Sequence, residues 1–209
     1  MTAKIILTMI LSMLRKDNAS EQRIAEAMNH LTQLSEAIAE GATTDVPATR
    51  LIALSYEESR FGLPYKGYKP ISGAKACGVF QQIPKWSYVK GTTCAKLNND
   101  LAFATKAAVA NLRHITKAFV AKKKNAKDLR PLDERIDDAL CHYYSGNECD
   151  DAEALAYAKR HRDSRLKAIS ISKGKAYNKP IKRSVMRASF GLPPSQIDAV
   201  CKGCPPLTI

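Results

Sequence analysis

The chain lacks any apolar run long enough to cross a membrane. Its longest such stretch, residues 5–14, lies between Lys4 and Arg15, whereas a membrane-spanning helix needs about 20 apolar residues. Charged residues follow the stretch directly and no convincing small-residue cleavage site appears, so it is not typical of a secretory signal. We therefore expect a buried helix here and no integral membrane span.

Acidic residues are also scarce. The 209 residues include 20 Asp and Glu against 33 Lys and Arg, which gives a formal net charge of +13 and a pI near 9.5. This balance predicts attraction to a polyanion. Bacterial cell wall, nucleic acid and anionic membrane all qualify, so charge alone does not choose between them.

The cysteine pattern argues against a zinc site. A structural zinc ion needs four ligands, and C-x-x-C occurs only once, at residues 201–204. The six cysteines instead fall into three sequence-local pairs, which is compatible with disulfides, although reduced and buried thiols stay open as an alternative. The pairs are Cys77 with Cys94, Cys141 with Cys149, and Cys201 with Cys204.

Two helices are expected before residue 45. The first is the apolar stretch at residues 5–14. Asn18 and Glu21 then form a plausible capping box for a second helix, whose apolar stripe runs from Ile24 to Ile38 and which Gly41 ends.

A further helix is predicted to begin after Asp45, which can cap it, with Pro47 in its first turn, and to stop at Gly62 and Pro64. Beyond residue 98, periodic patterns predict helices over residues 101–119 and from Pro131 to Tyr143. The chain is expected to become helical again after Glu148, through about Ile169.

Glu58 stands out on the helix that follows Asp45. Leu51, Leu54 and Glu58 share one helical face because they are spaced by three and four residues. Only Glu58, and not Glu57, is then expected to point inward. Removal from water disfavours the charged form of a carboxyl group and raises its pKa toward that of a useful general acid. On spacing alone, an ordinary surface residue at a fraying helix end stays open.

Residues 63–88 are expected to be loop and short strand, because proline and glycine recur through them. Among the aromatics of this segment, Phe80 and Trp86 are assigned to the core. Tyr65 and Tyr68 are the better candidates for stacking on sugar faces in a cleft.

Two blocks around Glu58 resemble paired motifs of a known family. Residues 58–61 read ESRF and residues 72–84 read SGAKACGVFQQIP. They are similar to E-S-x-F and S-x-A-x-A-x-G-L-M-Q-x-x-P of the soluble lytic transglycosylases, in the goose-type lysozyme-like superfamily. Val79 and Phe80 replace Leu and Met. Residues 142–147, HYYSGN, resemble the Y-N-A-G segment more weakly, with Tyr144 where Asn is usual.

The resemblance implies a mainly α fold of the α+β lysozyme-like kind, a helical catalytic domain with a short loop or hairpin region and extra terminal helices. A chain of this length can bury about 70% of its unfolded surface, enough for one core. We divide it into an N-terminal helical extension (residues 1–44), a catalytic domain (residues 45–150), and a basic helix followed by a Cys- and Pro-rich strap packed on that domain (residues 151–209).

The same resemblance implies roles for individual residues. Glu58 is the catalytic acid, Ser59 orients it by a hydrogen bond, and Tyr143 holds it. Gln81 contacts the substrate sugar or its acetamido group, and Gly78 belongs to the same substrate-binding loop. No metal and no cofactor is expected.

The lack of acidic residues after Glu58 favours a mechanism with a single carboxylate. Glycoside hydrolases usually need two carboxyl groups, and residues 60–98 contain no Asp or Glu. The resemblance implies cleavage of peptidoglycan between N-acetylmuramic acid and N-acetylglucosamine with a 1,6-anhydro product. Asp133, Glu134 and Asp137 could still reach the cleft, which keeps a hydrolytic muramidase open. A non-catalytic wall-binding or nucleic-acid-binding basic protein is the third alternative.

Peptidoglycan strands are the expected partner, and the first two helices could bind a virion or secretion-machine protein. We expect a monomer that acts in the periplasm or cell wall without binding nucleic acid. The setting, whether phage lysin, virion-borne enzyme or secretion-system transglycosylase, is left open by the sequence.

Overall fold

The structure, a computed structural model, describes residues 1–63, 76–120, 130–146 and 149–173. The predicted cleft residues Tyr65 and Tyr68, the predicted Cys- and Pro-rich strap (residues 191–209) and its pair Cys201 and Cys204 lie outside the described residues. Within the described ranges the protein is mainly helical and has no strand, only an isolated antiparallel bridge between Cys77 and Gln82. The helical class is thus confirmed.

Nine α-helices and two shorter helical turns make up the described part of the chain. They are α1 (Ala3–Lys16), α2 (Glu21–Glu26), α3 (Met28–Gly41), α4 (Ala48–Ser59), the 3-10 turn η1 (Pro84–Trp86), α5 (Cys94–Asn99), α6 (Leu101–Ile115), the π-helical turn η2 (Thr116–Val120), α7 (Leu132–Ala139), α8 (Cys141–Ser145) and α9 (Ala152–Ser172).

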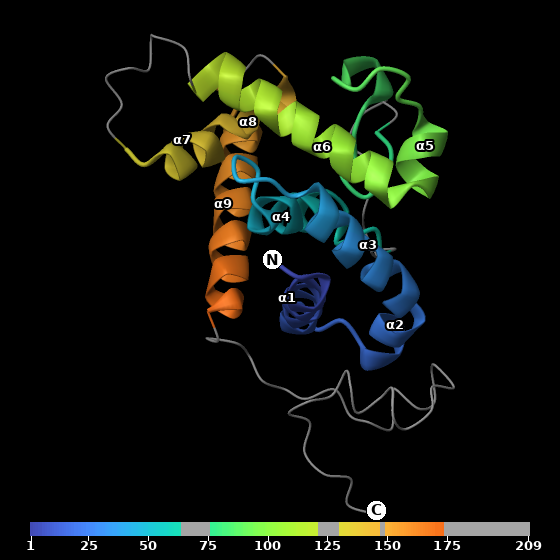
Figure 1. The fold of residues 1–209 in the computed structure, drawn as a ribbon. Coiled ribbons are helices and arrows are strands. Elements are labelled where there is room, and N and C mark those ends of the chain that lie inside the picture. Colours follow the sequence, from blue (N-terminus) through green and yellow to red (C-terminus); the bar gives the residue numbers. More distant parts are fainter. Residues whose placement is uncertain (64–75, 121–129, 147–148, 174–209) are drawn as a thin grey trace, which may run out of the picture.

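Helix α4 lies at the centre of the fold, with α6 on one side, α1 on the other and α9 running past its end (Figure 1). Every residue from Ala48 to Tyr56 is buried. The predicted inward face is confirmed, because Leu51 and Leu54 are fully buried. Burial on all sides makes α4 the support on which the site is built.

The predicted cap of α4 is wrong. Pro47 occupies the N-cap position and no side chain caps the helix. Asp45 instead accepts hydrogen bonds from Arg113 at 2.7 and 3.0 Å and from Thr43 at 2.7 Å. The carboxylate of Asp45 therefore binds Arg113 of α6 instead of the first amides of α4.

Helix α4 ends earlier than expected, at Ser59. Arg60, Phe61 and Gly62 follow in the left-handed conformation, with φ values of 51°, 65° and 75°. The amide of Arg60 donates to the Tyr56 carbonyl at 2.9 Å and that of Phe61 to the Ser55 carbonyl at 3.0 Å, which satisfies the last carbonyls of the helix.

Helix α1 is buried as predicted and packs against α3, α4 and α9. The predicted capping box after it is wrong. Ser20 caps α2 by accepting a bond from the Arg23 amide at 3.3 Å. Glu21 is free of that role because its carboxylate pairs with Arg15 at 2.8 Å. The expected single helix is divided at Ala27 into α2 and α3.

A buried ionic network joins α4, α7 and α9. Asp137 is fully buried and accepts hydrogen bonds from Arg50 at 2.6 Å and from Arg165 at 2.5 and 3.0 Å. Asp133 adds a bond to Arg50 at 3.0 Å. The three helices are thereby joined through the first turn of α4, opposite the end that carries the glutamates.

Two disulfides confirm two of the sequence-local pairs. Cys77 is bonded to Cys94 and Cys141 to Cys149, each with 5.3 Å between Cα atoms. The first joins the loop after residue 76 to α5, and the second encloses α8.

One hydrophobic cluster contains residues from α1, α3, α4, α6 and α9, from Ile6 to Ala168. All three predicted segments therefore contribute to one core, and their division into domains stays a prediction. None of the described helices is both long and apolar enough to traverse a bilayer.

Candidate active site

Glu58 lies partly buried at the C-terminal turn of α4. Its Oε1 atom accepts a hydrogen bond from the hydroxyl group of Tyr157, which lies 99 positions later on α9. Helices α4 and α9 pack against each other, so the contact depends on tertiary packing.

Burial raises the pKa of Glu58 to about 8, from an ordinary value of 4.5. The hydrogen bond from Tyr157 opposes this rise because it stabilises the carboxylate. The negative charge of Glu57 adds to the rise, and the positive charge of Arg160 opposes it. Glu58 therefore carries a proton at neutral pH, as a general acid must.

The prediction that only Glu58 points inward is wrong, since the side chain of Glu57 is only 6% exposed. The two glutamates nevertheless have unlike surroundings, as predicted. Glu57 accepts a hydrogen bond from Ser164 at 2.5 Å and lies 3.7 Å from both Arg60 and Arg160. Cations and a hydroxyl group thus surround Glu57, whereas a tyrosine contacts Glu58.

Ser59 does not make the expected hydrogen bond to Glu58. Its hydroxyl group donates to the carbonyl of Val79 at 2.7 Å and accepts from the amide of Gly62 at 2.7 Å. The residue instead connects the end of α4 to the loop at residues 77–82, which we name the glutamine loop.

The glutamine loop is held from several directions. Tyr143 of α8 donates to the Phe80 carbonyl at 2.9 Å, next to the carbonyl that Ser59 binds. The buried Gln82 donates to the Ala104 carbonyl of α6 at 2.9 Å. The loop that resembles a family motif is therefore a rigid part of the site.

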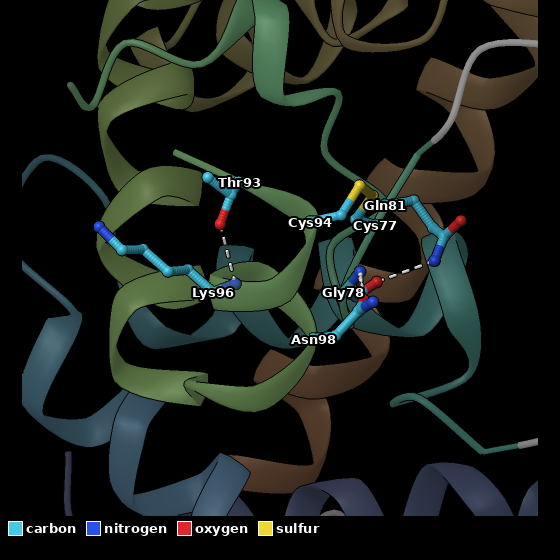
Figure 2. The surroundings of a disulfide bond; sticks show 7 residues. All are labelled: Cys77, Gly78, Gln81, Thr93, Cys94, Lys96 and Asn98. Carbon is cyan, nitrogen blue, oxygen red and sulfur yellow. Dashed lines mark hydrogen bonds between the residues drawn. A yellow bond between two sulfur atoms is a disulfide. The ribbon is translucent and has the colours of Figure 1, made fainter. Parts of the chain in front are cut away.

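Gly78 and Gln81 form the turn of this loop beside the Cys77–Cys94 disulfide (Figure 2). Gly78 has φ of 75°, and a Cβ atom there would lie 2.4 Å from the Leu97 carbonyl oxygen. Its amide donates to Asn98 at 2.7 Å, and the side chain of Gln81 donates to the Gly78 carbonyl at 2.8 Å. Gly78 shapes the loop, and the α5 backbone leaves no room for a side chain.

The expected role of Tyr143 as the direct support of Glu58 is wrong. Its hydroxyl group is bound to Phe80, and Tyr157 holds the glutamate instead. Burial raises the pKa of Tyr143, and the charge of Glu58 raises it further. Tyr143 is therefore close enough to Glu58 to interact with its charge.

Tyr157 was missed because it lies beyond the segment that resembles the family. A signal for it exists in the helical spacing of α9. Ala154, Tyr157, His161 and Arg165 follow at intervals of three and four residues, and all are buried. That face packs on α4, so an aromatic hydroxyl on it was a candidate partner for an inward glutamate.

A cleft of about 640 Å³ lies beside this centre, between the glutamine loop, α6, η2 and α8. Of the predicted site residues, Gln81 and Tyr143 line it, whereas Glu58, Ser59 and Gly78 do not. Tyr143 connects the cleft with the buried glutamate. The other lining residues are Gln82, Ile83, Lys85, Trp86, Ser87, Tyr88, Asn111, His114, Ile115, Phe119, His142, Tyr144, Ser145 and Gly146.

Aromatic rings are exposed along the cleft. The assignment of Trp86 to the core is wrong, because it is 63% exposed, and Tyr88 is 56% exposed, while Phe80 is fully buried as predicted. Tyr88 stacks on His114 with 3.8 Å between ring centres, and Phe119 on His142 with 3.5 Å. Such flat apolar faces beside amides suit the faces and hydroxyl groups of sugars.

The third block of the family resemblance forms α8 and the turn after it. Tyr144 stacks on Tyr157 with 5.4 Å between ring centres and donates to Glu153 at 2.9 Å. Asn147, the last residue of the block, lies outside the described residues.

No Asp or Glu is among the described residues that line the cleft. Asp137 is enclosed by the arginines of α4 and α9, Asp133 pairs with the same arginines, and Glu134 is exposed on α7. The acidic residues proposed as a second carboxylate are thus used elsewhere or lie away from the cleft.

Cys141, His142 and Cys149 place three potential metal ligands within 4.8 Å of one another. The two sulfur atoms are joined in a disulfide, so they are not thiolates, the form that binds zinc. With the disulfide formed, the imidazole of His142 is the one group of the three that could bind a metal ion.

Comparison with family models, with curated proteins and with solved structures found no match to the chain.

Proposed function

We propose that the protein is a peptidoglycan lytic transglycosylase with a lysozyme-like fold. The observation that carries the proposal is the partly buried Glu58, whose pKa of about 8 keeps it protonated at neutral pH beside a cleft with exposed aromatic rings. The motif resemblance around residues 58–61 and 72–84 supports the same reaction.

In the first step, the proton of Glu58 passes to the oxygen between N-acetylmuramic acid and N-acetylglucosamine. The bond from that oxygen to C1 of the muramoyl sugar breaks, and the N-acetylglucosamine side leaves as an alcohol. The acetamido oxygen of the muramoyl sugar then bonds to C1 and stabilises the positive charge. The Tyr157 hydroxyl group stabilises the carboxylate that remains on Glu58.

In the second step, the muramoyl 6-hydroxyl group attacks C1 and its proton returns to Glu58. The bond between C1 and the acetamido oxygen breaks, which leaves a 1,6-anhydro product and a protonated enzyme. The same burial that keeps Glu58 protonated at first makes its carboxylate a stronger base, so one residue serves both steps.

A hydrolytic muramidase is the runner-up, with water in place of the 6-hydroxyl group. Inverting hydrolysis uses a second carboxylate to activate that water, and the described cleft wall has no acidic residue. The absence of a facing carboxylate favours the internal hydroxyl group as the nucleophile. Because the proposed substrate is peptidoglycan, the protein would act at the bacterial cell wall.

Digestion of purified peptidoglycan, with mass spectrometry of the released fragments, tests the proposal. Wild-type protein should release fragments with 1,6-anhydro ends, and Glu58→Gln should release none. Reducing ends would establish the muramidase, and no release by wild-type protein would reject both enzymes. Salt-sensitive retention on DNA without such release would instead favour a nucleic-acid-binding protein.

A further inference from the structure

Arg160 is a charged residue of α9 that lies near the carboxyl group of Glu58 and is open to solvent. Its side chain is 55% exposed. The guanidinium carbon lies 5.9 Å from the ring centre of Tyr157, the residue that binds Glu58. The hydrogen bond with Glu153 raises the pKa of Tyr144, which lines the cleft, and the positive charge of Arg160 opposes this rise. The cation is therefore next to the proposed reaction centre and accessible from outside.

The contact of Arg160 with Glu57 leaves most of its hydrogen-bonding capacity unused. Its Nε atom is 3.7 Å from Glu57, beyond hydrogen-bond distance. Glu57 already accepts a bond from Ser164 at 2.5 Å. Among the described residues, no acceptor lies within hydrogen-bond distance of the two terminal amino groups of Arg160. Those groups form a planar pair that matches the two oxygens of a carboxylate.

Other arginines of α9 differ in this respect. Arg165 is buried and hydrogen-bonded to Asp137 of α7. Arg162 lies 3.8 Å from Asp138, also of α7, on the side away from the glutamates. Arg162 is thus a matched control, since it is a partly exposed arginine two positions along the same helix.

We infer that Arg160 binds a carboxylate of the substrate beside the cleaved bond and so selects muramoyl glycans over uncharged ones. This inference rests on the proposed function. A muramoyl sugar carries a lactyl group whose carboxyl is either free or extended by a stem peptide with its own carboxylates. Polymers of N-acetylglucosamine alone carry neither group. The chemistry recognised is one carboxylate, from the lactyl group or from the peptide.

Calorimetric binding to full-length protein carrying Glu58→Gln tests the inference without turnover. The ligands are a peptide-free tetrasaccharide of alternating N-acetylglucosamine and N-acetylmuramic acid, the same glycan with stem peptides, and a tetramer of N-acetylglucosamine. Adding Arg160→Gln should weaken binding of at least one muramoyl ligand by about tenfold, the worth of a charge-assisted hydrogen bond. Binding of the uncharged tetramer should change by less than about twofold.

The pattern across the ligands identifies the carboxylate. Loss with the peptide-free glycan assigns the lactyl group, and loss only with the peptide-bearing glycan assigns the stem peptide. Arg162→Gln should leave all three affinities within about twofold. Equal weakening of all three by Arg160→Gln, no weakening, or no binding of any ligand would overturn the inference.

Failure of the inference and failure of the proposed function are distinguishable. Anhydro products from wild-type protein, with no carboxylate preference at Arg160, would reject the inference alone. A carboxylate preference at Arg160 without any release from peptidoglycan would reject the transglycosylase alone and leave a muramoyl-binding protein.

Discussion

At the scale of single residues, the unusual protonation of Glu58 results from its position between two helices. Its carboxyl group is withdrawn from water at the contact of α4 with α9, and its hydrogen bond comes from a neutral tyrosine rather than from a cation. The neighbouring Glu57 has two arginines nearby. Adjacent identical side chains therefore differ because α9 presents different partners to each.

Glu58→Gln should change the pH dependence of stability as well as abolish product release. The folded chain holds the Glu58 proton up to about pH 8, whereas an unfolded chain loses it near its ordinary value of 4.5. The folded state binds more protons within this window, so wild-type stability falls as pH rises through it and levels off above. Gln does not titrate, and the variant should gain on wild type by about 5 kcal/mol across the window.

Denaturant unfolding of both proteins at pH 4, 6 and 9 measures this difference. Parallel stability curves for the two proteins would contradict the assigned burial of Glu58. Circular dichroism at each pH controls for loss of helix.

Tyr157→Phe should lower turnover by about tenfold to a hundredfold, the range for a hydrogen bond to a charged group. The alkaline limb of the pH profile should also move to higher pH, because loss of the hydroxyl group raises the pKa of Glu58 further. Profiles of kcat/KM against pH measure the shift.

Tyr143→Phe is the control for Tyr157→Phe. Its hydroxyl group binds the Phe80 carbonyl, so that change should cost about 1 kcal/mol of stability and leave the limb in place. A limb unmoved by Tyr157→Phe would contradict the contact.

At the scale of elements, the glutamine loop is rigid because α4 and α8 bind its backbone and α6 binds the side chain of Gln82. Ser59 and Tyr143 hold adjacent carbonyls, and Gln82 reaches α6. The disulfide between Cys77 and Cys94 adds α5 to these supports. Gln81 is therefore presented to the cleft by four helices together.

Gly78→Ala should destabilise the protein by more than about 3 kcal/mol. The new Cβ atom would combine a positive φ with a contact of 2.4 Å to the Leu97 carbonyl oxygen, which belongs to α5 backbone and cannot move cheaply. Gly146→Ala is matched to it, with φ of 77° and no atom within 4 Å of the new Cβ. That variant should lose less, about 1–3 kcal/mol, because it carries only the backbone cost of a φ of 77° with a ψ of −108°. Chemical denaturation compares the two, and equal losses would contradict the steric explanation.

At the scale of the whole molecule, Asp137 and its two arginines join α4, α7 and α9. This network has little contact with solvent, so each charge depends on the others. Two helices of the network, α4 and α9, also carry Glu58 and Tyr157, so the network supports the contact between these two residues.

Asp137→Asn should therefore destabilise the protein by about 3–5 kcal/mol, because it leaves Arg50 and Arg165 buried without their counter-charge. Asp138→Asn is the neighbouring control. Asp138 is 45% exposed and pairs with Arg130 at the surface, where loss of an ion pair costs less than about 1 kcal/mol. Denaturant midpoints of the two variants measure the contrast. A small loss at both positions would mean that the network does not hold the helices together.

Much of the local structure could be predicted from residue periodicity and composition. The buried helix at residues 5–14, the inward face of Leu51 and Leu54, the buried Phe80 and two disulfide pairs all agree with the structure. The helix caps at Asp45 and Asn18 do not, because Arg113 takes Asp45 from another helix and Ser20 caps α2.

The sequence by itself determined the helical class and the inward faces of the helices, because these depend on spacing along one helix. The choice of Glu58 rested on the motif resemblance as well and stays a prediction. Only the tertiary structure decided that Tyr157 rather than Tyr143 holds Glu58, that Glu57 is also withdrawn from water, and that Trp86 faces solvent. Each of these depends on which distant helix packs against the residue. The spacing of α9 indicates that Tyr157 points inward, but no local pattern indicates that it meets Glu58, 99 positions away.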